Sequence, residues 1–121
     1  GLWGMPGGAL EVGETGAEGA AREFHEETGM TCKIVGLAGV FDSRYWGSSS
    51  RHHLYQFVFI GELVDGKEMG NGSHKQEVLD VAWFAEDELP LAEMDANHAG
   101  RVPVVFTVWR REEQPFFDNG T

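Results

Sequence analysis

The chain has 121 residues, which is enough for one hydrophobic core and too few for two. Its formal net charge of −11 argues against general affinity for nucleic acid, because phosphate backbones are bound through basic groups. The longest apolar run of consequence, residues 57–60, is far too short to cross a membrane. The single cysteine, Cys32, excludes an internal disulfide and favours a reducing, cytoplasmic location. We therefore expect one domain over residues 1–121 that binds neither nucleic acid nor membrane.

The first 14 residues are rich in glycine and predict a structured loop or a short strand with turns. They begin with Gly-Leu-Trp-Gly-Met-Pro-Gly-Gly, and Gly1 is not an initiator methionine. We expect that a natural upstream segment is absent from this sequence.

Residues 15–28 predict a helix. Thr15 is a suitable N-cap, and Gly29 follows as a C-terminal glycine should. Four apolar residues follow the i, i+3, i+4, i+7 rule and predict the face that packs inward: Ala17, Ala20, Ala21 and Phe24.

The remaining residues predict strands at 33–41, 52–64 and about 78–84, with polar loops at 42–51 and 67–75. A helical turn is expected at 86–89. A helix is expected within 98–112, with Pro103 in its first turn or at a kink. Strands and helices interleave, so the sequence predicts an α/β fold with a mixed sheet between helices.

Three glutamates share one stripe of the predicted helix. Glu23 and Glu27 are one turn apart, and Glu26 lies beside them. Such a stripe repels itself, and Arg22, four residues before Glu26, can steady only part of it. A hard divalent cation would stabilise the stripe, because Mg²⁺ prefers oxygen ligands and commonly binds a few carboxylates together with a substrate phosphate.

The residues before the helix suit the same site. Gly7 and Gly8 allow a sharp turn of the backbone, so that a main-chain carbonyl can approach a metal. Glu14, at the N-terminal edge of the helix, could pair with Arg22 and orient the neighbouring ligands.

Residues 8–30 resemble the signature of the Nudix hydrolases, G-x5-E-x7-R-E-U-x-E-E-x-G-U, in which U is a bulky apolar residue. Phe24 and Met30 occupy the apolar positions. Every other fixed position is matched, by Gly8, Glu14, Arg22, Glu23, Glu26, Glu27 and Gly29. Looser similarity extends through Trp83-Phe84 and Glu88-Leu89-Pro90.

The resemblance implies an α/β/α sandwich around a central mixed sheet, here without the N-terminal strands that such proteins usually have. It implies a Mg²⁺ or Mn²⁺ site in which Glu26, Glu27 and the carbonyl of Gly7 are ligands. Glu23 would be a third ligand or the general base, and Arg22 would hold a glutamate by an ion pair. Glu77, in the loop before the third predicted strand, is the other candidate for the base.

Arg44 and Arg51 are candidates to bind substrate phosphates, because arginine binds phosphate through two parallel hydrogen bonds. The function expected is hydrolysis of a diphosphate bond, in a nucleoside diphosphate linked to another group, such as ADP-ribose, or in a nucleoside triphosphate. One alternative is a Nudix-like module that senses a nucleotide without cleaving it. Another is a prenyl diphosphate isomerase, for which Cys32 is a poor candidate nucleophile. The resemblance also makes a homodimer possible.

Overall fold

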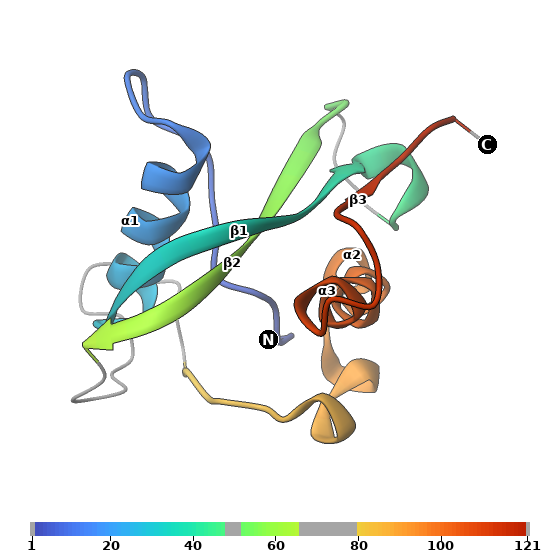
Figure 1. Ribbon diagram of the computed structural model, residues 1–121. Helices are drawn as coiled ribbons and strands as arrows, with labels where there is room; N and C mark the ends of the chain where they lie inside the picture. Colours follow the sequence, from blue (N-terminus) through green and yellow to red (C-terminus); the bar gives the residue numbers. More distant parts are fainter. Residues whose placement is uncertain (1, 48–51, 66–79, 121) are drawn as a thin grey trace. The chain divides into compact units, whose positions relative to one another are not determined.

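The computed structural model describes residues 2–47, 52–65 and 80–120 (Figure 1). Its regular elements are listed here in chain order: α1 (Gly16–Thr28), β1 (Thr31–Asp42), the 3₁₀ turn η1 (Ser43–Tyr45), β2 (Tyr55–Asp65), the 3₁₀ turns η2 (Glu86–Glu88) and η3 (Leu91–Glu93), α2 (Ala96–Ala99), α3 (Arg101–Trp109) and β3 (Phe116–Phe117).

The sheet has the strand order β2-β1-β3, so β1 is the central strand. β3 runs parallel to β1, with Gly39 opposite Phe116 and Val40 opposite Phe117. β2 runs in the opposite direction to β1 (Figure 1), which makes the sheet mixed. The predicted α/β fold with a mixed sheet is thus confirmed.

Most of the predicted elements are present. β1 and β2 correspond to the strands expected at 33–41 and 52–64, and η2 to the expected helical turn. α3 lies within the range predicted for the last helix, and Pro103 is its third residue. At that position proline removes no hydrogen bond of the helix, because the first N–H groups of a helix have no partner within the helix. β3 was not predicted, since two residues are too few to show a periodicity.

The strand predicted at 78–84 is wrong for the residues that the structure describes, because 80–84 have no regular structure; 78 and 79 lie outside the described ranges. The side chain of Asp80 accepts a hydrogen bond from the N–H of Val81, at 2.8 Å. Local contacts of this kind compete with the hydrogen bonds of a strand ladder.

The predicted apolar face of α1 is only partly correct. Its four members (Ala17, Ala20, Ala21 and Phe24) are half-buried, whereas the buried residues of the helix are Gly19, Glu23 and Thr28. The most buried side of this helix therefore includes a carboxylate.

The chain divides into two compact units. The first contains Pro6–Gly36 and Gly61–Phe84, and therefore α1. The second contains Leu2–Met5, Leu37–Ile60 and Ala85–Thr121, and therefore α2, α3 and β3.

An aromatic core lies in the second unit. The side chain of Phe41 is completely buried. It stacks on Phe116, with ring centroids 4.9 Å apart, and meets the edge of Trp46 at 5.0 Å. The guanidinium of Arg101 lies 5.6 Å from the centre of the Phe41 ring. Aromatic pairs of this geometry stabilise a fold beyond the area they bury.

The segment Leu2–Met5 is bound to the residues before and within α2. Trp3 forms a parallel bridge with Met94: its N–H donates to the carbonyl of Glu93, and its carbonyl accepts from the N–H of Asp95, both at 2.9 Å. The N–H of Met5 donates to Nδ1 of His98 at 3.0 Å. Nδ1 of this histidine is therefore unprotonated in the folded chain.

No helix in the described part of the chain has the length and apolar character needed to span a membrane.

We predict that the chain loses stability on mild acidification because of His98. Burial, and then the charge of Arg101, lower the pKa of this histidine from its ordinary value of 6.5. Because the folded chain disfavours the charged imidazole, the contribution of His98 to the free energy of unfolding is complete above pH 6.5. It is lost progressively as the pH falls below that value. Urea unfolding between pH 8 and 5 should show this decline, and His98→Gln should reduce it. A decline of the same size in the variant would contradict the assignment to His98.

Candidate metal-binding and catalytic site

The predicted limits of helix α1 are confirmed, and they fix the register of its glutamates. Thr15 is the N-cap: its hydroxyl accepts from the N–H of Glu18 at 3.1 Å, and the Glu18 carboxylate accepts from the N–H of Thr15 at 2.8 Å. Gly29 ends the helix with a φ of 76°, a left-handed conformation that favours glycine. This reciprocal capping box leaves little freedom in where the helix begins.

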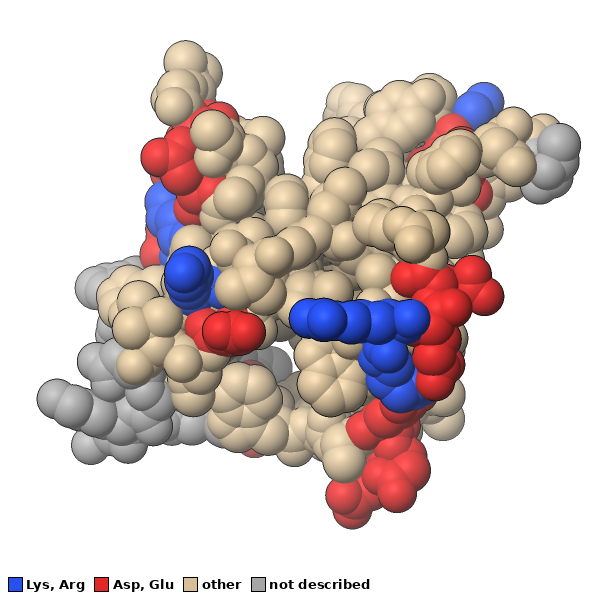
Figure 2. All heavy atoms as spheres, in the orientation of Figure 1, with Lys and Arg blue, Asp and Glu red and all other residues tan. Residues whose placement is uncertain are grey.

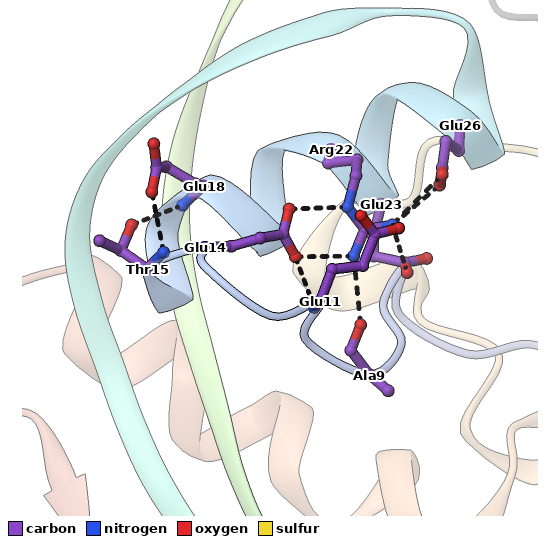
Figure 3. Close-up of polar contacts among 8 residues, drawn as sticks. All are labelled: Ala9, Glu11, Glu14, Thr15, Glu18, Arg22, Glu23 and Glu26. Atoms are coloured by element: carbon purple, nitrogen blue, oxygen red, sulfur yellow. Dashed lines mark hydrogen bonds and ion pairs between the residues drawn. The ribbon is translucent and has the colours of Figure 1, made fainter.

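Arg22 is the centre of the site (Figure 3). Its Nε and Nη2 bind the two carboxylate oxygens of Glu14 at 2.8 and 2.9 Å. Its Nη1 donates to Glu23 at 2.9 Å and to Glu26 at 3.0 Å, and Nη2 also donates to the carbonyl of Ala9 at 3.1 Å. The predicted pairing of Arg22 with Glu14 is thus present, and the same guanidinium holds two of the candidate metal ligands.

The electrostatics follow from these contacts. The hydrogen bonds from Arg22, and then the backbone N–H of Glu11, lower the pKa of Glu14 to about 2. The pKa of Arg22 is raised in turn, chiefly by its hydrogen bond with Glu14. One guanidinium faces four carboxylates, those of Glu11, Glu14, Glu23 and Glu26, so negative charge remains in excess around Arg22.

The glycine-rich loop packs closely on the helix. A Cβ atom on Gly8 would lie 2.6 Å from Oε1 of Glu23, so a larger residue at this position would displace this buried carboxylate. A Cβ on Gly19, within the helix, would clash with the side chain of Leu10 and approach Glu14. Both glycines therefore allow loop and helix to approach each other.

Glu27 and Gly7 are also in contact. The N–H of Gly7 donates to the carboxylate of Glu27, at 3.2 Å to Oε2 and 3.4 Å to Oε1. The loop thus meets the helix at two of the residues predicted to bind metal. The structure tests no role of the Gly7 carbonyl, which stays a prediction.

The donors suit a hard divalent cation. Glu23, Glu26 and Glu27 offer carboxylate oxygens, which Mg²⁺ and Mn²⁺ prefer, and the excess negative charge around Arg22 would be reduced by a cation. Within the described ranges, no three acidic, histidine or cysteine side chains are grouped closely enough to hold a metal ion. Arg22 lies between Glu14, Glu23 and Glu26 and binds their oxygens itself.

Of the other predicted site residues, the structure describes only one. Arg44 is in the second unit, where it is bound to Asp42. Arg51 and Glu77 are outside the described residues. Asp42 was not among the predicted site residues, although its carboxylate is buried and is held by Arg44 and His53. A single aspartate at the end of an apolar strand has no distinguishing pattern, so only the fold identifies it.

Residues 1–105 match the sequence pattern that defines the NUDIX domain family. The chain belongs to the NUDIX family. That match includes the whole of the Arg22 cluster and the loop that precedes it, so the resemblance inferred from residues 8–30 is confirmed.

The relatives of this NUDIX chain are named as pyrophosphatases and diphosphatases. It is 35% identical to an ADP-ribose pyrophosphatase of Methanocaldococcus jannaschii, over 67% of the chain and 47% of the relative. It is 31% identical to a Bacillus subtilis protein named "Putative 8-oxo-dGTP diphosphatase", over 74% of the chain and 54% of the relative. A crystal structure of a UDP-X diphosphatase matches with a TM-score of 0.82 and 28% identity, over 97% of the chain and 55% of that protein. The chain spans about half the length of these relatives.

We predict that Gly8→Ala destabilises the chain and that Gly7→Ala does not. A methyl group at position 8 would overlap the buried carboxylate of Glu23, whereas a methyl group at position 7 meets no atom within 4 Å. Overpacking of this kind costs about 1–3 kcal/mol. The free energy of unfolding in urea, measured for both variants, is the test. Equal stability of the two variants would show that Gly8 does not lie against Glu23.

We predict a second pH dependence from Glu14. Its pKa is lowered from the ordinary value of 4.5 to about 2, so its ionised form stabilises the folded chain. That contribution is complete above pH 4.5 and is lost as the pH falls towards 2. The difference in unfolding midpoint between the natural chain and Glu14→Gln should therefore be constant above about pH 5 and shrink below it. A difference that stays constant down to pH 2 would contradict the Arg22 contact.

Proposed function

We propose that this chain hydrolyses a diphosphate bond in a nucleoside diphosphate linked to another group, with Mg²⁺ or Mn²⁺ as cofactor. The main support is the cluster in which Arg22 binds Glu14, Glu23 and Glu26, with Glu27 one residue further along the same helix. On a surface helix without a ligand, so many carboxylates around one arginine would repel one another and destabilise the helix. A divalent cation would offset this repulsion and could bind a substrate phosphate at the same place.

In this proposal Glu23, Glu26, Glu27 and the carbonyl of Gly7 hold the metal. A divalent cation bound there would neutralise phosphate oxygens and make a bound water more acidic. Arg22 acts through its neighbours: it fixes the side chains of Glu23 and Glu26, and Glu14 fixes Arg22 from the loop. Because the pKa of Glu14 is low, this support stays charged at every pH at which such an enzyme would work.

The general base has two candidates. Glu23 is buried beside Gly8 and is bound by Arg22. Glu77 is the alternative by the resemblance to Nudix hydrolases. A base must accept a proton from the attacking water while the groups around it remain aligned. Comparing the pH dependence of turnover for Glu23→Gln and Glu77→Gln would distinguish the two.

The names of the relatives support the substrate class. ADP-ribose and UDP-X both contain a nucleoside diphosphate joined to a further group, and a nucleoside triphosphate is the alternative suggested by 8-oxo-dGTP. Arg44 and Arg51 are proposed to bind substrate phosphates, and a homodimer remains part of the proposal.

We predict that Glu27→Gln abolishes turnover and preserves the fold. Glutamine keeps an oxygen that can accept the hydrogen bond from Gly7, but it loses the charge that a divalent cation requires. Cleavage of ADP-ribose with Mg²⁺, followed by chromatography of the products, should fall by ~100-fold or more. Glu113→Gln, at an exposed position in the second unit, is the matched control and should keep full turnover. Full turnover by Glu27→Gln would defeat the proposal.

A further inference from the structure

A second group of polar and aromatic side chains lies at the end of β1, within the second unit. We name it the Asp42 cluster: Asp42, Arg44, Tyr45, His53 and Tyr55. The carboxylate of Asp42 is almost fully buried, with 5% of the side chain exposed, whereas the side chain of Arg44 is 58% exposed. A buried anion thus holds an exposed cation, which is the arrangement expected where an arginine is oriented towards solvent.

Asp42 orients Arg44 through one edge of its guanidinium. Nη2 of Arg44 donates to Oδ2 of Asp42 at 2.7 Å, and Nε donates to Oδ1 and Oδ2 at 3.1 and 3.2 Å. Arginine has five N–H donors. The two N–H groups of Nη1 and the second N–H of Nη2 are not used by Asp42, so one edge of the guanidinium stays available for an acceptor such as phosphate.

Asp42 also joins the two ends of the loop between β1 and β2. Its Oδ1 accepts from the backbone N–H of Arg44 at 3.1 Å and is 3.0 Å from Nε2 of His53. The arginine beside it holds the pKa of Asp42 well below its usual range, so the proton between Asp42 and His53 belongs to the histidine. Asp42 therefore holds both Arg44, just after β1, and His53, just before β2.

Two exposed tyrosines accompany these residues. The guanidinium carbon of Arg44 lies 5.5 Å from the centre of the Tyr45 ring, and the rings of His53 and Tyr55 are 5.1 Å apart. Tyr45 is 54% exposed and Tyr55 is 59% exposed. Trp46, by contrast, packs in the aromatic core and donates its indole N–H to Asp118 at 2.9 Å. A flat ligand could therefore stack on the tyrosines but not on Trp46.

We propose that the Asp42 cluster binds a nucleotide, with Arg44 bound to a phosphate group and the tyrosine rings in contact with the base. Asp42 and His53 act as positioning residues. The inference rests on the proposed function only for the choice of a nucleotide as ligand. An arginine alone would select no more than an anion, and the exposed aromatic rings beside it add selectivity for a planar group.

Arg44 differs from Arg110 in how its charge is balanced. The chain has nine lysines and arginines against 20 acidic residues. On the face shown in Figure 2, most basic side chains lie directly against acidic ones. Arg110 illustrates this: it is bound by both Glu86 and Glu112, which are themselves exposed. Arg44 is instead bound by a buried carboxylate, which leaves its outer edge facing solvent.

The test is calorimetric titration of ADP and of inorganic pyrophosphate in EDTA, so that neither a metal nor turnover is involved. Arg44→Gln should raise the Kd of both ligands by about tenfold, the usual effect of losing a charge-assisted hydrogen bond. Arg110→Gln changes the net charge equally and should leave both Kd values unchanged. Tyr55→Ala should weaken binding of ADP and leave that of pyrophosphate as it is. Thermal unfolding of each variant shows whether its fold is kept.

Unchanged ADP affinity in Arg44→Gln, or equal losses in Arg44→Gln and Arg110→Gln, would overturn the proposal. If Arg44→Gln does not fold, Tyr55→Ala decides: equal affinity for ADP in this variant and in the natural chain would overturn it. Binding of ADP through Arg44 without any hydrolysis would sustain this inference and defeat the proposed function. Hydrolysis with unchanged KM and Kd in Arg44→Gln would overturn this inference, and with it the proposed phosphate contact of Arg44, while leaving the proposed hydrolysis intact.

Discussion

The hydrogen bonds of Arg22 determine the geometry of the first unit. This one guanidinium binds the loop through Ala9 and Glu14 and binds the helix through Glu23 and Glu26. Without it, neighbouring carboxylates on successive turns of α1 would repel one another and the helix would be less stable. With it, acidic side chains can be held close together in a folded chain before any cation is present. Arg22 therefore offsets the repulsion that would otherwise keep these carboxylates apart.

The sequence predicted this part of the molecule because its determinants are local. Thr15, Glu18 and Gly29 define the helix by contacts within a few residues, and the spacing of Arg22 from Glu26 follows from the helical repeat. The pairing of Arg22 with Glu14 was predicted for the same reason. What could not be predicted is the burial of Glu23, which depends on how closely the loop at Gly8 approaches the helix.

The second unit shows the opposite case. Asp42 meets His53, which is 11 positions away in the sequence, and its backbone N–H donates to Asp118, 76 positions away. No periodicity in the sequence indicates such pairs, so Arg44 was the one member of the Asp42 cluster among the predicted site residues, and the fold was needed to identify its partners Asp42 and His53. The same reason explains why β3 was not predicted, since it forms by pairing with the distant strand β1. It also bears on the error at 80–84, where an apolar pattern forms no strand in the described part of the chain. Apolar alternation indicates a tendency to form a strand, but whether a strand forms also depends on a neighbouring strand with which it can pair.

The attachment of residues 9–14 to α1 has a further consequence for how such chains can vary. Surface loops usually tolerate added or deleted residues, because little depends on their exact path. Here the path is fixed at both ends, by Arg22 on Ala9 and on Glu14, and the small side of Gly19 receives Leu10 between them. One residue more or less would displace the Glu14 carboxylate from its partner. This stretch should therefore keep a constant length even where residues other than Glu14 and Leu10 change.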